Sequence, residues 1–183
     1  MRGILLDADA FRCLRELGLL EPLARSFSKS SYVACTEYVA RMELSAVARD
    51  VTGLEQAGHL QVHPVKRGTP EFERYRVLCR QGDKGEAEAI AWALEKRLAD
   101  RPVFVTRDNG ATRLARQQGV PVTDVLGLTL LAVLVAAVTE VDASTALQPW
   151  EVERTGRCRP TLYEGVQAAL TLHGEAIRTL FSV

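Results

Sequence analysis

Four acidic positions in this chain are spaced in a way that suits metal-dependent hydrolysis. Asp7 and Asp108 each follow a short apolar run, and Glu43 lies in a segment with helical spacing. The fourth position is Glu88, near the start of a later helix, with Glu86 as its competitor. Carboxylates that gather in one place raise each other's pKa values unless a cation neutralises them. Their hard oxygen atoms suit Mg²⁺ or Mn²⁺, which bind phosphate and activate water, so no serine, cysteine or histidine nucleophile is needed.

Each of these acids also has a local structural explanation. Asp7 and Asp9 follow an expected strand, where aspartate commonly hydrogen-bonds to the backbone of a turn. Glu86 and Glu88 lie in the first turn of an expected helix, where the helix dipole favours negative charge. Asp108 begins a turn that leads into a helix. Only convergence of the acids in space would distinguish a metal site from these separate roles.

The order of apolar runs and helical segments predicts an α/β fold. We expect short strands at residues 4–6, 32–35, 60–62, 103–106 and 120–123. Helical spacing is found at residues 11–17, 21–27, 36–49 (with Thr36 as N-cap), 71–80, 86–98, 111–118 and 125–138. Strands that alternate with helices form a parallel sheet covered on both faces, and ligands bind beyond the carboxyl ends of its strands. Asp7 and Asp108 fall at that edge.

The chain length predicts one domain with an appendage. The 183 residues are enough for a single hydrophobic core. We expect a domain at residues 1–138 and a C-terminal helical extension, residues 139–183, packed on it. The extension is predicted to hold turn-like pieces up to residue 159. A terminal helix is then expected at residues 161–181, broken at Gly165 or Gly174.

Composition limits the classes of partner. The 23 basic and 23 acidic residues give no net charge, so any RNA-binding surface must come from local basic patches. The four cysteines are scattered without a C-x-x-C pair, which favours free thiols in a reducing cytoplasm. We find no signal peptide, and the apolar residues 125–138 are too few to span a bilayer. We therefore expect a cytoplasmic protein that does not enter membranes.

Several segments resemble the PIN-domain nuclease family. Residues 4–9 (ILLDAD) are similar to its opening strand, and residues 103–108 (VFVTRD) to its late strand ending in T-x-D. Residues 85–93 (GEAEAIAWA) and 115–122 (ARQQGVPV) resemble a subgroup of predicted nucleic-acid-binding PIN proteins. The resemblance covers roughly residues 4–138. It implies a Rossmann-like PIN fold and a Mg²⁺- or Mn²⁺-dependent ribonuclease activity, often as the toxin of a toxin–antitoxin pair.

The resemblance also implies roles for individual acids. The residues that match the family's catalytic metal site are Asp7, Glu43, Glu88 and Asp108. Glu88 is chosen because Glu88-Ala89-x-Ala91 fits the family's D-A-x-x-A pattern, although Glu86 competes for this role. The two glutamates point to nearly opposite sides of a helix, since consecutive positions differ by about 100°. Glu37 is the alternative to Glu43, and Asp9 is a possible further ligand.

Neighbouring residues are expected to support this site. Thr106 and Asn109 would orient ligands or water, while Arg107 and Arg113 would contact RNA phosphates. The expected partners are RNA, an antitoxin protein and a second copy of the chain in a homodimer.

Two other functions fit parts of the pattern. The first is an inactive PIN-like module that binds RNA or protein. The second is a phosphatase resembling haloacid dehalogenases, with Asp7 as nucleophile and Asp9 as acid/base. That motif calls for Thr or Val where this chain has Phe11, and it leaves Glu43 and Glu88 without a role.

Overall fold

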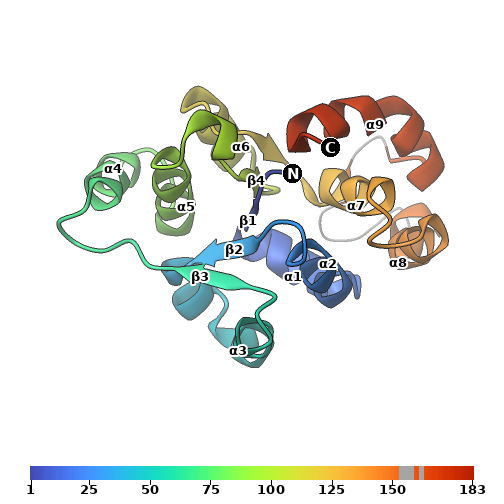
Figure 1. The fold of residues 1–183 in the computed structure, drawn as a ribbon, viewed down its shortest axis with the longest axis horizontal. Helices are drawn as coiled ribbons and strands as arrows, with labels where there is room; N and C mark the ends of the chain where they lie inside the picture. Colours follow the sequence, from blue (N-terminus) through green and yellow to red (C-terminus); the bar gives the residue numbers. More distant parts are fainter. Residues whose placement is uncertain (153–158, 161–162) are drawn as a thin grey trace.

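A five-stranded, all-parallel sheet forms the centre of the protein (Figure 1). The computed structural model describes residues 1–152, 159–160 and 163–183. The strands lie in the order β3-β2-β1-β4-β5. Their bounds are β1 (Ile4–Leu6), β2 (Val33–Thr36), β3 (Gln61–His63), β4 (Val103–Val105) and β5 (Val122–Thr123). The predicted α/β fold with a short parallel sheet flanked by helices is confirmed, and it is Rossmann-like.

Helices cover both faces of this sheet. One face carries α1 (Ala8–Glu16), α2 (Leu20–Phe27), α7 (Val125–Leu134) and the C-terminal helices, and the other carries α4 (Pro70–Leu78), α5 (Lys84–Leu94) and α6 (Asn109–Gln117). A short 3₁₀ turn, η3 (Leu98–Asp100), leads into β4. Alternate side chains of β1 enter different cores: Ile4 and Leu6 pack with α1 and α2, while Leu5 packs with α5. The three central strands β1, β2 and β4 are buried on both sides, whereas the edge strands β3 and β5 are partly exposed.

The single helix predicted at residues 36–49 is wrong. Thr36 is the last residue of β2, and the chain then forms a π-helical turn η1 (Val39–Glu43), a 3₁₀ turn η2 (Ser45–Val47) and α3 (Ala48–Gln56). The N–H of Leu44 donates to the carbonyl of Val39, five residues back, at 2.9 Å. This wider turn keeps Val39 and Leu44 on the same buried side. π-Turns of this kind often occur at functional sites.

The C-terminal region is more helical than expected. The turn-like pieces predicted up to residue 159 are wrong, because α8 (Glu140–Val152) occupies most of this stretch. Helix α9 (Val166–Phe181) begins directly after Gly165, whose φ of +115° suits glycine, and it continues through Gly174. Residues 153–158 and 161–162, which include parts of the predicted tail, lie outside the described residues.

The C-terminal helices share a core with the sheet. Leu147 and Trp150 of α8 and Ile177 and Phe181 of α9 belong to the same buried cluster as Ile4. The backbone N–H of Arg2 donates to the carbonyl of Phe181 at 3.0 Å, which joins the two ends of the chain. The extension therefore packs directly on the sheet domain.

Two remaining features concern the cysteines and the membrane. Cys13, Cys35 and Cys79 are not part of a disulfide, and Cys158 lies outside the described residues. Within the described part of the chain, no helix combines the length and apolar character needed to cross a membrane.

Candidate metal centre

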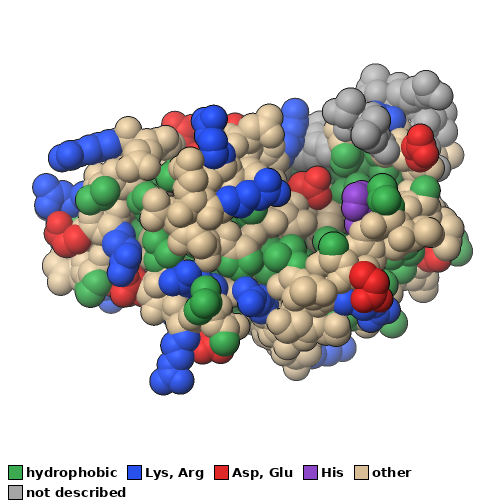
Figure 2. All heavy atoms as spheres, turned by 90° about the horizontal axis from the view of Figure 1, so that it is seen from above, with side chains coloured by type: hydrophobic (Ala, Val, Ile, Leu, Met, Phe, Trp, Pro, Cys, Tyr) green, Lys and Arg blue, Asp and Glu red, His purple; other side chains and the backbone are tan. Residues whose placement is uncertain are grey.

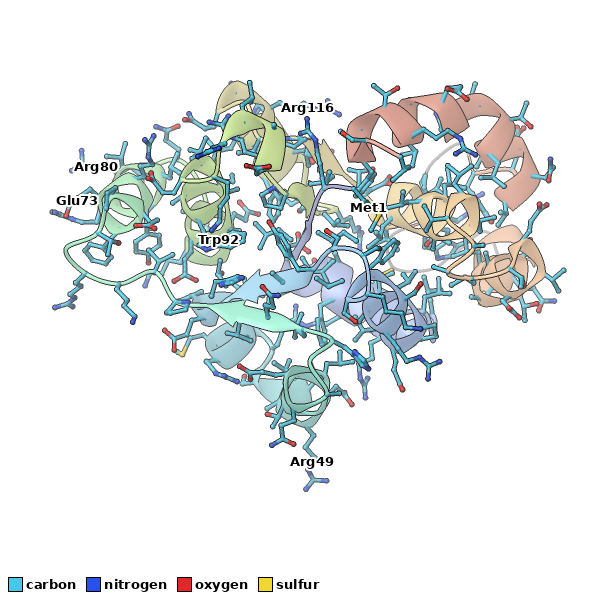
Figure 3. All side chains as sticks on the ribbon, viewed as in Figure 1. Met1, Arg49, Glu73, Arg80, Trp92 and Arg116 are labelled. Carbon is cyan, nitrogen blue, oxygen red and sulfur yellow. The ribbon has the colours of Figure 1, made fainter. Side chains whose placement is uncertain are left out.

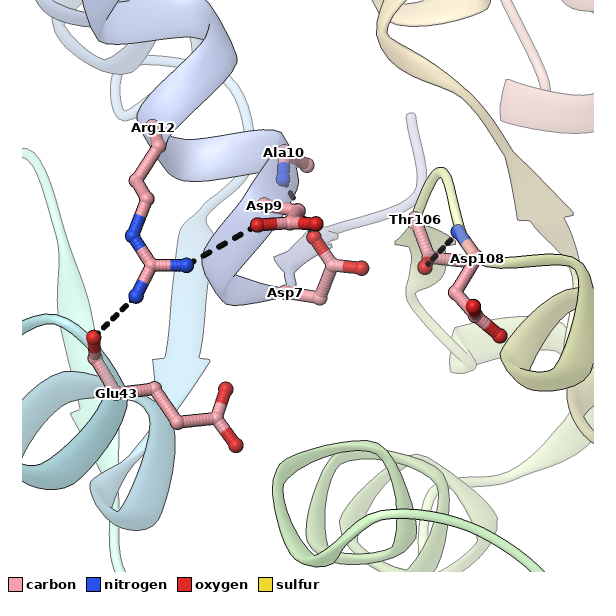
Figure 4. Close-up of polar contacts among 7 residues, drawn as sticks. All are labelled: Asp7, Asp9, Ala10, Arg12, Glu43, Thr106 and Asp108. Carbon is pink, nitrogen blue, oxygen red and sulfur yellow. Dashed lines mark hydrogen bonds and ion pairs between the residues drawn. The ribbon is translucent and has the colours of Figure 1, made fainter. Parts of the chain in front are cut away.

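The candidate site lies beyond the carboxyl ends of β1 and β4, where the sheet's connections reverse direction. Strands β2 and β3 extend to one side of β1, and β4 and β5 to the other. Parallel sheets usually bind ligands at such a point, where the strand order reverses. The N–H of Asp7 donates to the carbonyl of Val105 at 3.1 Å, and Asp108 follows Val105 by three residues. Figure 4 shows the side chains of Asp7, Glu43 and Asp108 in this region of the structure.

Asp7 is a buried helix cap. Its Oδ1 accepts the N–H of Ala10 at 2.6 Å, and its side chain is 7% exposed. Burial raises its pKa to about 6. The Thr106 hydroxyl and the Ala10 N–H oppose that rise by donating to the carboxylate, whereas the nearby charges of Asp9 and Glu43 add to it. Above about pH 6 this carboxylate is therefore charged, and holding the buried charge costs stability unless a cation offsets its lost hydration.

Thr106 connects Asp7 to Asp108. Thr106 is buried, its hydroxyl hydrogen-bonds to the Asp7 carboxylate, and its Oγ1 accepts the N–H of Asp108 at 3.1 Å. Asp108 in turn caps α6, because its Oδ1 accepts the N–H of Ala111 at 2.8 Å. The predicted supporting role of Thr106 thus has a geometric basis, and Asn109 is the exposed first residue of α6.

Glu43 reaches the site from the end of the π-helical turn. Its half-buried carboxylate accepts the backbone N–H of Gly85. A Cβ on Gly85 would overlap that carboxylate, so only glycine permits the approach. Burial raises the pKa of Glu43, the Arg12 guanidinium opposes the rise, and Asp83 adds to it. Arg12 also donates to the Glu43 carbonyl and pairs with Asp9 at 3.1 Å (Figure 4).

Of the two competing glutamates, Glu86 is the one that faces the acidic site. Burial raises the pKa of Glu86 to about 7, and the neighbouring charges of Asp108, Asp83 and Asp7 contribute. Glu88 is buried elsewhere, where its Oε2 accepts the N–H of Tyr38 at 2.9 Å. The geometry therefore favours Glu86 over Glu88 as a ligand and gives Glu88 a structural role at the junction of β2 and η1.

Of the remaining residues predicted from the sequence, some lie near the acidic site and others do not. Glu37 is exposed and its charge acts on Glu88, so it lies with Glu88 and not with the acidic site. Asp9 borders the site but is paired with Arg12. Arg107 and Arg113 are both exposed, and neither is ion-paired to a described carboxylate.

Sequence reasoning missed three contributors to the site: Arg12, Asp83 and Gly85. In the sequence, the run Gly82-Asp83-Lys84-Gly85 lies between the helices predicted at residues 71–80 and 86–98. In the structure Asp83 is the N-cap residue of α5, and its charge acts on both Glu43 and Glu86. An aspartate directly before a helix start was the available signal, since this is a favoured N-cap position.

The oxygen atoms of the four acids are suitable ligands for a hard divalent cation, but they do not form a preformed coordination cage. Asp7, Glu43, Glu86 and Asp108 present only oxygen ligands, and none is ion-paired to a described Lys or Arg. Among the described residues, no three His, Cys, Asp or Glu side chains form a ready coordination group. Mg²⁺ commonly binds through one or two carboxylates and several waters, which suits this open arrangement.

Comparison with known proteins found no counterpart: no protein family, curated protein or solved structure matches this chain. Its class is therefore defined by its own fold and site. It is a Rossmann-like α/β protein with carboxylates gathered where the order of its parallel strands reverses.

Proposed function

We propose that the protein is a metal-dependent ribonuclease of PIN type, with Mg²⁺ or Mn²⁺ as cofactor. The supporting observation is that Asp7, Glu43, Glu86 and Asp108 come from four separate elements, and that their charges act on one another: Glu43 on Asp7, and Asp7 and Asp108 on Glu86. Burial and mutual repulsion raise the pKa values of Asp7 and Glu86 towards neutrality. A cation bound among these carboxylates would offset that repulsion.

The chain's own residues would hold the reaction centre rigidly. Asp7 and Asp108 are fixed by the helices that they cap, and Thr106 sets their relative position. Glu43 is fixed by the N–H of Gly85. When bound, the cation would lower the pKa of a water and offset charge on the phosphodiester. Arg107, exposed beside Asp108, is free to contact a phosphate oxygen.

The first experiment compares two neighbouring glutamates on one helix. RNA cleavage is measured with Mn²⁺ for the wild type, Asp7→Asn, Glu86→Gln and the control Glu88→Gln. Asp7→Asn and Glu86→Gln should lose roughly 100-fold or more in rate, because each removes a negative charge that would bind the metal ion. Glu88→Gln should stay within about threefold of the wild type, since Gln can still accept the Tyr38 N–H. Loss in Glu88→Gln with activity retained in Glu86→Gln would reverse the assignment.

An inactive RNA- or protein-binding module is the second candidate. It is favoured by one observation, that no three of the described acids already form a coordination group. This candidate predicts RNA binding that is unchanged by EDTA and by Asp7→Asn, with no cleavage. The phosphatase alternative is disfavoured, because Asp9 is paired with Arg12 and is not placed as an independent acid/base.

The expectation of a partner protein rests on the toxin hypothesis alone. As a toxin, the chain would bind a small antitoxin that blocks the acidic site, and it would arrest growth when expressed without it. Light scattering of the purified chain tests the homodimer.

A further inference from the structure

A cavity adjoins the acidic site at Thr106. It has a volume of about 570 Å³ and lies between β4, β5, α6, α7 and α9. We call it the β5 cavity. Thr106, which hydrogen-bonds to Asp7, is also one of its lining residues. The β5 cavity therefore meets the acidic site at Thr106.

Two arginines and one carboxylate, that of Asp124, line the β5 cavity. Arg107 and Arg116 both line it, both are exposed, and neither is ion-paired to a described carboxylate. Figure 3 shows Arg116 between α6 and α9. Figure 2 shows basic side chains spread over the face seen from above and interleaved with acidic ones. The positive charge here is thus local, as the zero net charge requires.

Apolar side chains also line the β5 cavity. Leu126 of α7 and Ile177 of α9 line it and are each 7% exposed. The imidazole of His173, one turn before Ile177 on α9, also lines the cavity. Helix α9 therefore completes a cavity that the sheet domain alone would leave open on one side.

We propose that the β5 cavity receives one unpaired nucleotide of the RNA next to the cleaved phosphate; this rests on the proposed function. Its volume lies within the roughly 300–1,000 Å³ typical of small-ligand sites. A nucleotide combines a flat base with a phosphate. The base matches the Leu126–Ile177 surface and the His173 ring, and the phosphate matches two guanidinium groups. In this way the C-terminal extension selects which nucleotide is held beside the scissile bond.

Binding is tested directly with nucleoside 5′-monophosphates. Each of the four is titrated into the whole protein in EDTA, followed by NMR chemical shifts. The wild type should bind at least one in a saturable way. Arg116→Ala and His173→Ala should weaken that binding by about tenfold, the loss expected for one charge-assisted or stacking contact.

The matched control is Arg80→Ala. Arg80 is also exposed, and it lies beside α4, away from α9 (Figure 3). This variant should bind nucleotides like the wild type. Absence of saturable binding in the wild type, or equal binding by Arg116→Ala and the wild type, would overturn the proposal.

RNA cleavage separates this proposal from the proposed function. If the enzyme cleaves RNA, Arg116→Ala and His173→Ala should raise KM and change the preferred cleavage positions. Unchanged cleavage by both variants would overturn the nucleotide subsite and leave the ribonuclease standing, even if free nucleotides bind. If no RNA is cleaved but nucleotides bind through Arg116, the ribonuclease assignment fails, and with it the proposal that the cavity holds substrate.

Discussion

Asp7 and Asp108 hold equivalent positions at the ends of adjacent parallel strands. Each follows its strand and caps the next helix by accepting the backbone N–H of the residue three positions later, at 2.6 Å and 2.8 Å. Thr106 hydrogen-bonds to both residues. The same two carboxylates thus cap helices α1 and α6 and supply negative charge to the candidate metal site. A useful substitution must remove the charge and keep the cap.

Asp7→Asn should stabilise the protein in EDTA. Asn remains a good N-cap, while the cost of holding a buried charge disappears. The expected gain at pH 7.5 is at most roughly 2–3 kcal/mol, from about 1.4 kcal/mol per pKa unit. Urea denaturation measures it. Asp124→Asn is the control for stability, because Asp124 caps α7 through Gly127 at 2.8 Å and is exposed. A loss of stability in Asp7→Asn alone would assign Asp7 a structural role that requires its charge.

Stability in EDTA should fall as pH rises from about 4 to about 7. The pKa of Asp7 is raised from 3.8 to about 6 and that of Glu86 from 4.5 to about 7. The folded protein therefore binds these protons more tightly than the unfolded chain, so it loses stability as they dissociate. Thermal unfolding across this range measures the slope, which Asp7→Asn and saturating Mn²⁺ should each flatten. The same slope in all three samples would contradict this origin.

Gly85→Ala should weaken Mn²⁺ binding by about tenfold or more. The new methyl group would occupy the place of the Glu43 carboxylate, so that ligand must move. Calorimetric titration with Mn²⁺ measures the affinity. Gly53→Ala is the control, because Gly53 lies in α3 and a Cβ there meets nothing within 4 Å. Gly53→Ala should bind Mn²⁺ normally and gain up to about 1 kcal/mol in stability. Equal affinities in the two variants would remove Glu43 from the site.

Trp150→Ala should destabilise the whole protein by roughly 3–5 kcal/mol. Trp150 is 1% exposed and packs edge-on against Tyr163, with ring centroids 5.5 Å apart. If the extension folds as one unit with the sheet, every spectroscopic signal should report a single unfolding transition, with a midpoint lower than that of the wild type. Leu172→Ala, on the exposed side of α9, should change stability by less than about 0.5 kcal/mol. A separate early transition in Trp150→Ala would mean that the extension unfolds independently.

The features that were predicted best from the sequence are those that depend on residues close together along the chain. The strand at Ile4–Leu6, and the placement of Asp7 and Asp108 at a shared edge, follow from apolar runs that end in acid. The choice between Glu86 and Glu88 depends on how α5 is rotated against the sheet, and family similarity pointed to Glu88. Only the packed helix reveals that Glu88 is taken by the Tyr38 N–H.

Two elements were missed because tertiary packing overrides their local signals. The π-turn is stabilised by burial of both Val39 and Leu44, which an ideal helical pattern does not anticipate. Helix α8 contains Pro149 and little continuous apolar sequence, so its sequence predicts turns instead of a helix. Burial of Leu147 and Trp150 against the rest of the core outweighs this local preference.

The hydrogen bond from Arg2 to Phe181 has a practical consequence for handling this molecule. It places both chain ends together, at the end of β1 opposite Asp7 (Figure 1). An affinity tag or fused reporter at either end would therefore emerge from the side away from the carboxylates and leave them accessible. A short linker across the same gap could close the chain into a ring, since neighbouring termini tolerate circular permutation.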